Sequence, residues 1–198
     1  MKYLIAGGAG FLGSHVVEEL LSKGHEVLVV DNLVTGSLQN LESVNGNANF
    51  TFLRHDIRVP LNVLVDGIIN LACPASPVAY QSDPISTWET SVIGGRNLLM
   101  MAHDQGVKIL QASTSEVYGD PLVSPQSEEY WGNVNPIGIR SCYDEGKRSI
   151  ETLFADFRRI RSTDTRIARI FNSYGPRMAV HDGRAVSNFC VQALTGKP

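Results

Sequence analysis

Two segments of this chain carry residue types that can do chemistry together. The first holds Gly7, Gly10 and Gly13, and the second holds Tyr143 and Lys147. A Gly-x-x-Gly-x-x-Gly loop lets a dinucleotide pyrophosphate approach the backbone, and amides at the start of the next helix face the phosphates. Tyrosine and lysine four residues apart project from one helix face. Together the segments predict an enzyme that moves a hydride to or from a nicotinamide cofactor.

The acid/base of such a reaction would be Tyr143. A free tyrosine has a pKa of about 10 and is a poor base at neutral pH. The Lys147 ammonium and an oxidised nicotinamide both favour phenolate, so we expect a lowered pKa. Lys147 can also hold the nicotinamide ribose. Thr114 lies just after the end of a predicted strand, where its hydroxyl can share the substrate alcohol's proton with Tyr143. Glu116, two residues further on, has no charged partner within its own segment. Its alternative role is to cap a helix as a loop carboxylate.

Two carboxylates stand where the adenosine half of the cofactor would lie. Asp31 ends a predicted strand 18 residues after Gly13. There it can accept both ribose hydroxyls and repel the extra phosphate of NADP, which favours NAD. The alternative is an exposed Asp at a strand end. After the next predicted strand, Asp56 and Ile57 are placed to flank adenine, with a solvated Asp56 as the alternative.

The composition bounds the class of protein. The chain has 198 residues, of which 43% are hydrophobic, which suffices for one sizeable core. A net charge of -3 with scattered Lys and Arg argues against a nucleic-acid partner. Cys73, Cys142 and Cys190 have no metal-ligand spacing, so we expect reduced thiols and no metal. The first apolar run is too short for a signal peptide or membrane span, so we expect a soluble, cytoplasmic chain without a membrane partner.

Short apolar runs alternate with longer helical patterns along the chain. This alternation predicts an α/β fold, a doubly wound parallel sheet of the Rossmann type with its ligand at the carboxyl ends of the strands. Periodicity and glycine stops place strands at 2–6, 26–30, 50–53, 67–71, 107–112 and 166–171. They place helices at 11–23, 84–105, 140–160 and 185–195.

Longer strings show a resemblance. They are TSEVYGDP (114–121), PQSE (125–128), YWG (130–132), VNPIG (134–138), CYDEGKR (142–148), ARIFN (168–172), YGPRM (174–178) and DGR (182–184). With the glycine loop, they are similar to the extended short-chain dehydrogenase/reductase superfamily. Within it the chain resembles, over its whole length, the UDP-glucuronate decarboxylases, also called UDP-xylose synthases.

The resemblance implies a reaction and a set of site residues. NAD would oxidise the C4 hydroxyl of UDP-glucuronate, CO2 would leave from C6, and NADH would return the hydride to give UDP-xylose. By position, Tyr143, Lys147, Thr114 and Glu116 would be catalytic, with Glu116 beside C5 and C6 to orient or protonate. The implied cofactor contacts are Gly7, Gly10, Phe11, Leu12, Gly13, Asp31, Asn32, Thr35, Gly36, Asp56, Ile57, Leu71, Thr90, Tyr143, Lys147 and Arg184.

The chain departs from the family in charge and in length. Glu89 stands where the family usually carries Lys, which would reverse a charge near an anionic sugar nucleotide if that position faces the site. At 100–104 the usual sequence is also replaced, and a drifted surface helix explains this better than an altered substrate. Family members continue well beyond residue 198. We therefore expect an NAD-binding domain with the catalytic residues at 1–172 and only the beginning of a C-terminal substrate-binding lobe at 173–198, in either a fragment or a shortened protein.

Other readings remain open. Sugar-nucleotide epimerases and 4,6-dehydratases share the glycine loop, the Tyr and the Lys, although dehydratases typically carry Asp-Glu where Ser115 and Glu116 stand here. A catalytically silent NAD-binding module that pairs with a full-length partner is another alternative. Superfamily members commonly dimerise through two long helices, here 84–105 and 140–160, so we expect a homodimer.

Overall fold

A six-stranded parallel sheet forms the centre of the molecule, in the order β3-β2-β1-β4-β5-β6. The computed structural model describes residues 1–196, so the last two positions of the expected lobe segment, 197 and 198, lie outside the described residues. The strands are β1 (Lys2–Ala6), β2 (Glu26–Asp31), β3 (Phe50–Arg54), β4 (Gly67–Asn70), β5 (Lys108–Thr114) and β6 (Thr165–Ile170). All six lie within two residues of their predicted bounds. The order reverses between β1 and β4, which confirms the Rossmann arrangement.

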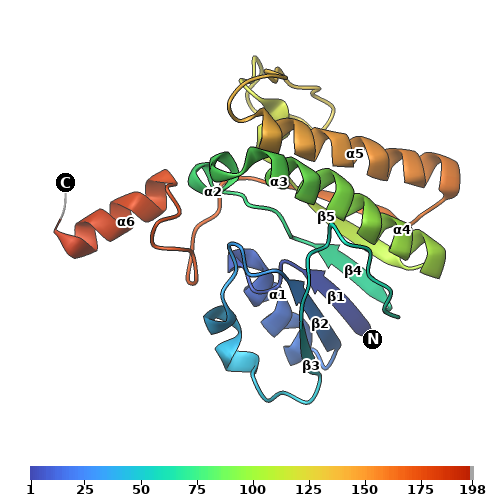
Figure 1. Ribbon diagram of the computed structural model, residues 1–198. Helices are drawn as coiled ribbons and strands as arrows, with labels where there is room; N and C mark the ends of the chain where they lie inside the picture. The colour runs from blue at the N-terminus through green and yellow to red at the C-terminus, as the bar shows by residue number, and fades with distance from the viewer. Residues whose placement is uncertain (197–198) are drawn as a thin grey trace.

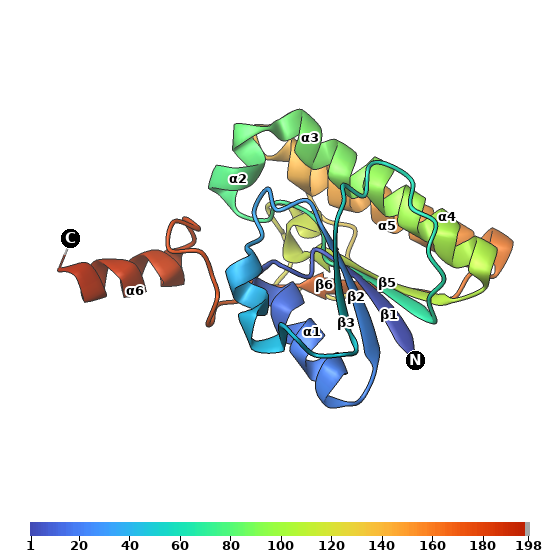
Figure 2. The same cartoon turned by 60° about the horizontal axis from the view of Figure 1, so that its bottom comes forward.

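Helices cover both faces of the sheet (Figures 1 and 2). The α-helices are α1 (Phe11–Ser22), α2 (Pro77–Ser82), α3 (Pro84–Glu89), α4 (Gly95–Gln105), α5 (Ser141–Arg161) and α6 (Ala185–Thr195). A π-helical turn, η2 (Thr90–Gly94), joins α3 to α4, so the predicted helix 84–105 is continuous but contains one widened turn. The sequence analysis missed α2 and the 3-10 segments η1 (Leu38–Val44) and η3 (Ser115–Tyr118).

Alternate residues of the central strands contribute to two hydrophobic cores, one on each face of the sheet. Leu4 of β1 faces α4 and α5 and packs with Ile150 and Phe154, whereas Ile5 faces α1 and packs with Val17. These five side chains are fully buried. Because successive residues of a strand point to opposite faces, β1 must be apolar on both sides. The two cores hold the carboxyl ends of the strands at one edge of the sheet.

Helix α6 stands apart from this body (Figure 1). It has no buried residue, and Phe189 and Leu194 are 70% and 88% exposed. The apolar surface of the last helix therefore lacks a cover in the part of the chain that the structure describes. No helix within residues 1–196 combines the length and the apolar character that crossing a membrane requires.

Candidate functional site

A cleft of about 1110 Å³ opens along the carboxyl ends of the strands. It spans the point where the strand order reverses, as expected for a ligand site in this architecture. Nearly all the predicted site residues line it: Gly7, Gly10, Phe11, Leu12, Gly13, Asp31, Asn32, Thr35, Gly36, Ile57, Leu71, Thr90, Thr114, Glu116, Tyr143, Lys147 and Arg184. Asp56 is the one predicted site residue that is not among them.

The glycine loop joins β1 to α1 and has no room for side chains. Gly7 has a left-handed φ of +76°, and a Cβ there would lie 2.7 Å from the backbone nitrogen of Ala72. A Cβ on Gly13 would collide with the carbonyl oxygen of Gly7. The N-cap of α1 is Gly10, with no side-chain cap and no acidic residue in the first turn. The first amides of α1 therefore stay available to an anion in the cleft.

Asp31 ties the glycine loop to the end of β2. Its carboxylate accepts hydrogen bonds from the backbone amides of Ala9 (3.0 Å) and Leu33 (2.8 Å). Burial raises the pKa of Asp31 above its usual range, and these two amides oppose the rise. A Cβ on Gly36 would come within 2.9 Å of the carboxylate, so the loop after β2 packs directly on it. Each carboxylate oxygen keeps a further lone pair for a ligand hydroxyl.

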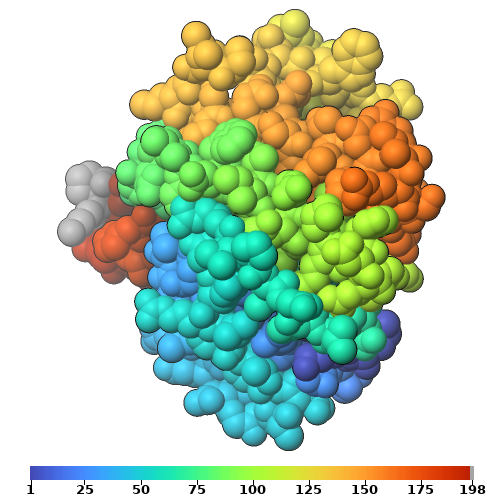
Figure 3. Space-filling model, turned by 45° about the vertical axis from the view of Figure 1, so that its right-hand side comes forward, coloured from blue at the N-terminus to red at the C-terminus, as the bar shows by residue number. Residues whose placement is uncertain are grey.

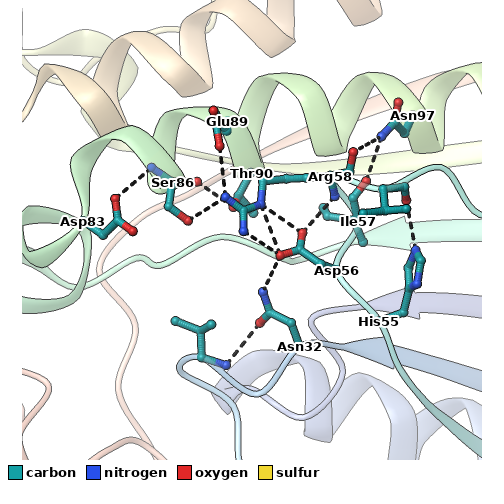
Figure 4. A network of polar contacts seen from close by, with 12 residues as sticks. Asn32, His55, Asp56, Ile57, Arg58, Asp83, Ser86, Glu89, Thr90 and Asn97 are labelled. Carbon is teal, nitrogen blue, oxygen red and sulfur yellow. Dashed lines mark hydrogen bonds and ion pairs between the residues drawn. The ribbon is translucent and has the colours of Figure 1, made fainter.

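Asp56 takes part in a charged network at the outer end of the cleft (Figure 4). The guanidinium of Arg58 donates to both its oxygens at 2.8–3.1 Å, and the Asn32 amide donates to it at 3.2 Å. The Arg58 hydrogen bonds lower the pKa of Asp56 to about 2. The Asp56 carboxylate therefore holds Asn32 and Arg58, while Ile57 beside it faces the cleft.

Glu89 belongs to the same network. Arg58 donates to its carboxylate at 3.0 Å and to the Ser86 hydroxyl at 3.0 Å. Glu89 does not line the cleft. The negative charge of Glu89 is thus paired with the positive charge of Arg58, outside the cleft.

Tyr143 and Lys147 lie side by side on the face of α5 that meets the cleft. Both are at most 6% exposed, and the Lys147 nitrogen lies 5.8 Å from the centre of the Tyr143 ring. That nitrogen donates to the backbone oxygen of Ala112 at 2.9 Å. Burial raises the pKa of Tyr143 above its usual value, with Cys73 adding to the rise and the Thr114 hydroxyl opposing it. In the protein alone the pKa is therefore raised, because burial of the phenol is the largest influence, whereas the expected lowering rested on Lys147 together with the oxidised nicotinamide.

Thr114 and Glu116 lie close enough to the Tyr143 phenol to act on it. Thr114 is the last residue of β5 and the N-cap of η3, where its hydroxyl accepts from the Glu116 amide at 3.2 Å. The Glu116 carboxylate forms an ion pair with Arg140, just before α5. The partner of Glu116 thus comes from a segment 24 residues away, which its own segment could not reveal.

Three residues of this region were not predicted from the sequence: Tyr80, whose ring stacks on that of Tyr143, and Arg140 and Asp144, whose charges act on Tyr80. Tyr80 lies in α2, where Ser76 caps and Pro77 begins the helix. A Ser-Pro pair is a helix-start signal that could have revealed this element. Arg140 lines the cleft, and burial raises the pKa of Asp144 to about 6.

The far wall of the cleft comes from the segment after β6. Arg177 is ion-paired to Glu18 of α1 at 2.5 Å, and His15 contacts the Pro176 oxygen at 3.1 Å. Arg184 lies at the N-cap of α6 and is held by Asp182 at 2.5 and 2.8 Å. Arg184 therefore reaches the cleft from a different segment than the other predicted residues.

Comparison with known proteins identifies a protein family and several relatives of this chain. The protein family described as GDP-mannose 4,6 dehydratase matches residues 4–198. UDP-glucuronic acid decarboxylase 6 of Arabidopsis thaliana is 57% identical over all 198 residues, which cover 58% of that relative. UDP-glucuronic acid decarboxylase 1 of Xenopus tropicalis is 54% identical over 99% of this chain and 47% of its own length. The chain therefore spans about half the length of these relatives.

Solved structures share the fold. Thermus thermophilus UDP-glucose 4-epimerase in complex with NAD matches with a TM-score of 0.82 and 32% identity, over 100% of this chain and 64% of that one. The Streptomyces venezuelae dTDP-glucose 4,6-dehydratase DesIV, with NAD bound, matches with a TM-score of 0.86 and 30% identity, over 99% and 63%. From the matched residues and the shared fold, the chain belongs to the GDP-mannose 4,6 dehydratase family.

Proposed function

We propose that this chain carries the NAD site and the acid/base machinery of a UDP-glucuronate decarboxylase. The observation that carries the proposal is that the Gly7–Gly13 loop and the Tyr143 phenol line one cleft. The identity of 57% to UDP-glucuronic acid decarboxylases over the whole chain supports this activity over that of an epimerase or a dehydratase.

The cofactor half of the cleft fits a dinucleotide. Gly7 and Gly13 pack directly on backbone, so the loop turns tightly and the uncapped start of α1 faces the cleft, where a pyrophosphate would bind. Phe11 and Leu12 would meet it, and Asp31 would receive the adenosine ribose. The remaining contacts would be Asn32, Thr35, Gly36, Asp56, Ile57, Leu71, Thr90, Tyr143, Lys147 and Arg184.

The chemistry half fits proton transfer at a sugar hydroxyl. When bound, NAD would take the hydride from C4 of the sugar and return it after the C6 carboxylate has left as CO2. Tyr143 would accept the C4 hydroxyl proton and later give it back, with Thr114 sharing it. Because burial favours the neutral phenol, Tyr143 needs the positive charges of Lys147 and of the oxidised cofactor to become a base. Glu116, held by Arg140, would orient or protonate at C5 and C6.

The proposal also covers the domains of the chain, its oligomeric state and its compartment. Residues 1–172 would be the NAD-binding domain, and 173–198 the beginning of a substrate-binding lobe, as the isolated position of α6 suggests (Figure 1). The homodimer would form over α3, η2, α4 and α5, which make one continuous surface (Figure 3). That surface has an apolar groove of about 370 Å³ that includes Ile85 and Trp88. Three free cysteines suit a reducing compartment, so we place the protein in the cytoplasm.

The decisive experiment is direct. The purified chain is incubated with UDP-glucuronate and NAD, and UDP-xylose and CO2 are followed by mass spectrometry. The Tyr143→Phe variant serves as the control. Product from the unaltered chain, with none from the Tyr143→Phe variant, supports the proposal. NAD binding without any product rejects decarboxylation by this chain and favours a silent NAD-binding module.

A further inference from the structure

The ring of Tyr80 is the closest aromatic neighbour of Tyr143 among the ring pairs in residues 1–196. Their ring centres are 5.0 Å apart and their planes differ by 8°. Tyr80 is 1% exposed and lines the same cleft. None of the motifs that predict the site includes it.

Several backbone contacts hold Tyr80 in this place. Its amide donates to the oxygen of Ser76 at 3.0 Å within α2. The backbone carbonyl oxygen of Tyr80 accepts hydrogen bonds from the Thr87 hydroxyl of α3 at 3.4 Å and from the Cys142 thiol of α5 at 3.6 Å. Since Cys142 directly precedes Tyr143, α2 and the catalytic turn of α5 are joined at this point. The stacked geometry is thus built by three helices.

The hydroxyl of Tyr80 is inaccessible to solvent, and no polar atom of the described residues has good hydrogen-bond geometry to it, although the Arg140 guanidinium is near enough to act on it. A buried hydroxyl without a partner costs free energy, so the hydroxyl does not explain why the ring is packed here. The flat face of the ring, which covers the Tyr143 ring, explains it better.

We propose that Tyr80 is a positioning residue for Tyr143: its stacked ring fixes the plane of the phenol and excludes water from it. The consequence for catalysis rests on the proposed function, whereas the contact itself can be tested without turnover.

The groups around the Tyr143 phenol act on its pKa in opposite directions, so the exclusion of water has a large effect on that pKa. Other groups that act on the phenol are Cys73 after β4, Thr114 and Glu116 at the end of β5, Lys147 on α5, and Arg184 before α6. Arg140 and Asp144 of the same region act on Tyr80. Burial is the largest influence and keeps the pKa of Tyr143 high. Removal of the Tyr80 ring would admit water, stabilise the phenolate and lower that pKa towards its ordinary value.

The test places 3-fluorotyrosine at position 143 of the full chain and reads its fluorine resonance by NMR as the pH is raised. Tyr80→Phe keeps the ring, so the resonance and its titration midpoint should stay where they are in the parent. Tyr80→Leu removes the ring, so the resonance should move and the midpoint should fall by about one pH unit or more. Tyr174→Leu, at a tyrosine that is 70% exposed, is the matched control and should change neither.

Three results would overturn the proposal. Tyr80→Leu could leave both the resonance and the midpoint unchanged. Tyr80→Phe could shift them as far as Tyr80→Leu does, which would assign the effect to the hydroxyl. The parent fluorine could be fully accessible to a paramagnetic probe in the solvent, a measurement that needs no Tyr80 variant. If circular dichroism shows that Tyr80→Leu does not fold, Tyr80→Met supplies a flexible side chain without a ring.

A kinetic arm separates this proposal from the assignment of Tyr143. Where turnover is measurable, Tyr80→Leu should lower the pH at which turnover rises, and Tyr80→Phe should not. Turnover retained in Tyr143→Phe would reject the acid/base role and leave the fluorine result for Tyr80 standing. Unchanged fluorine data with an inactive Tyr143→Phe would reject only the role of Tyr80.

Discussion

Arg58 donates a hydrogen bond to Glu89 across 3.0 Å and so joins the loop after β3 to α3 (Figure 4). The resemblance seen in the sequence implies a Lys at the position of Glu89. The opposite charge here has a partner in the same molecule, and that partner also holds Asp56 at the outer end of the cleft. The reversal therefore changes how the cleft is supported, without placing a carboxylate inside it.

Glu89→Lys should reduce the free energy of unfolding by about 1 kcal/mol, because the new ammonium would face the Arg58 guanidinium. Urea denaturation measures the change. Glu129→Lys makes the same substitution at an exposed position and is the control. Equal losses at the two positions would show that the contact with Arg58 contributes nothing to stability.

Asp144 should make stability depend on pH. Burial raises its pKa from 3.8 to about 6, so the folded chain binds more protons than the unfolded chain between these values. The free energy of unfolding should therefore fall as the pH rises through this window. Asp144→Asn should remove that fall and stabilise the chain by about 1 kcal/mol above pH 6. Thermal unfolding across this pH range checks it, with the exposed Asp104→Asn as comparison, and a fall that persists in Asp144→Asn would contradict the assignment.

Tyr143→Phe should lower turnover at least about a hundredfold, the usual scale for the loss of a general acid/base. NAD affinity should change little, because the ring and its stacking on Tyr80 remain. Product formation and calorimetry measure the two effects on one preparation. Turnover close to that of the parent would remove Tyr143 from the acid/base role.

Asp31→Ala should weaken NAD binding about tenfold and narrow its advantage over NADP, because charge-assisted bonds to the ribose are lost. Asp31→Asn is the matched variant, which keeps the shape and removes the charge. Calorimetric titrations with both nucleotides give the affinities. If neither variant alters either affinity, Asp31 has no part in ribose binding.

Trp88→Glu should convert the proposed homodimer into monomers, because it places a charge at the apolar groove between α3 and α5. Light scattering after size-exclusion chromatography reports the mass. Trp131→Glu, at a residue that is 89% exposed in the loop before α5, should leave the mass unchanged. A monomeric parent would refute the proposed assembly at once.

The Rossmann fold, the order of its main elements and most of the residues that line the cleft follow from patterns in the sequence. Glycine spacing, the apolar runs and the Tyr143–Lys147 pair are local patterns, and local patterns predict local structure. The place of Asp31 in the cleft was predictable because the residue stands at the end of a strand. All six strands were found for the same reason.

The contacts between side chains far apart in the sequence could be seen only in the folded chain. The pairing of Glu116 with Arg140, of Glu89 with Arg58, and the stacking of Tyr80 on Tyr143 join segments 24 to 63 residues apart. The direction of the Tyr143 pKa shift was decided there as well, because desolvation depends on everything that packs around the phenol. Lys147 and an oxidised nicotinamide suggested a lowered pKa, whereas the burial that raises it exists only in the folded chain.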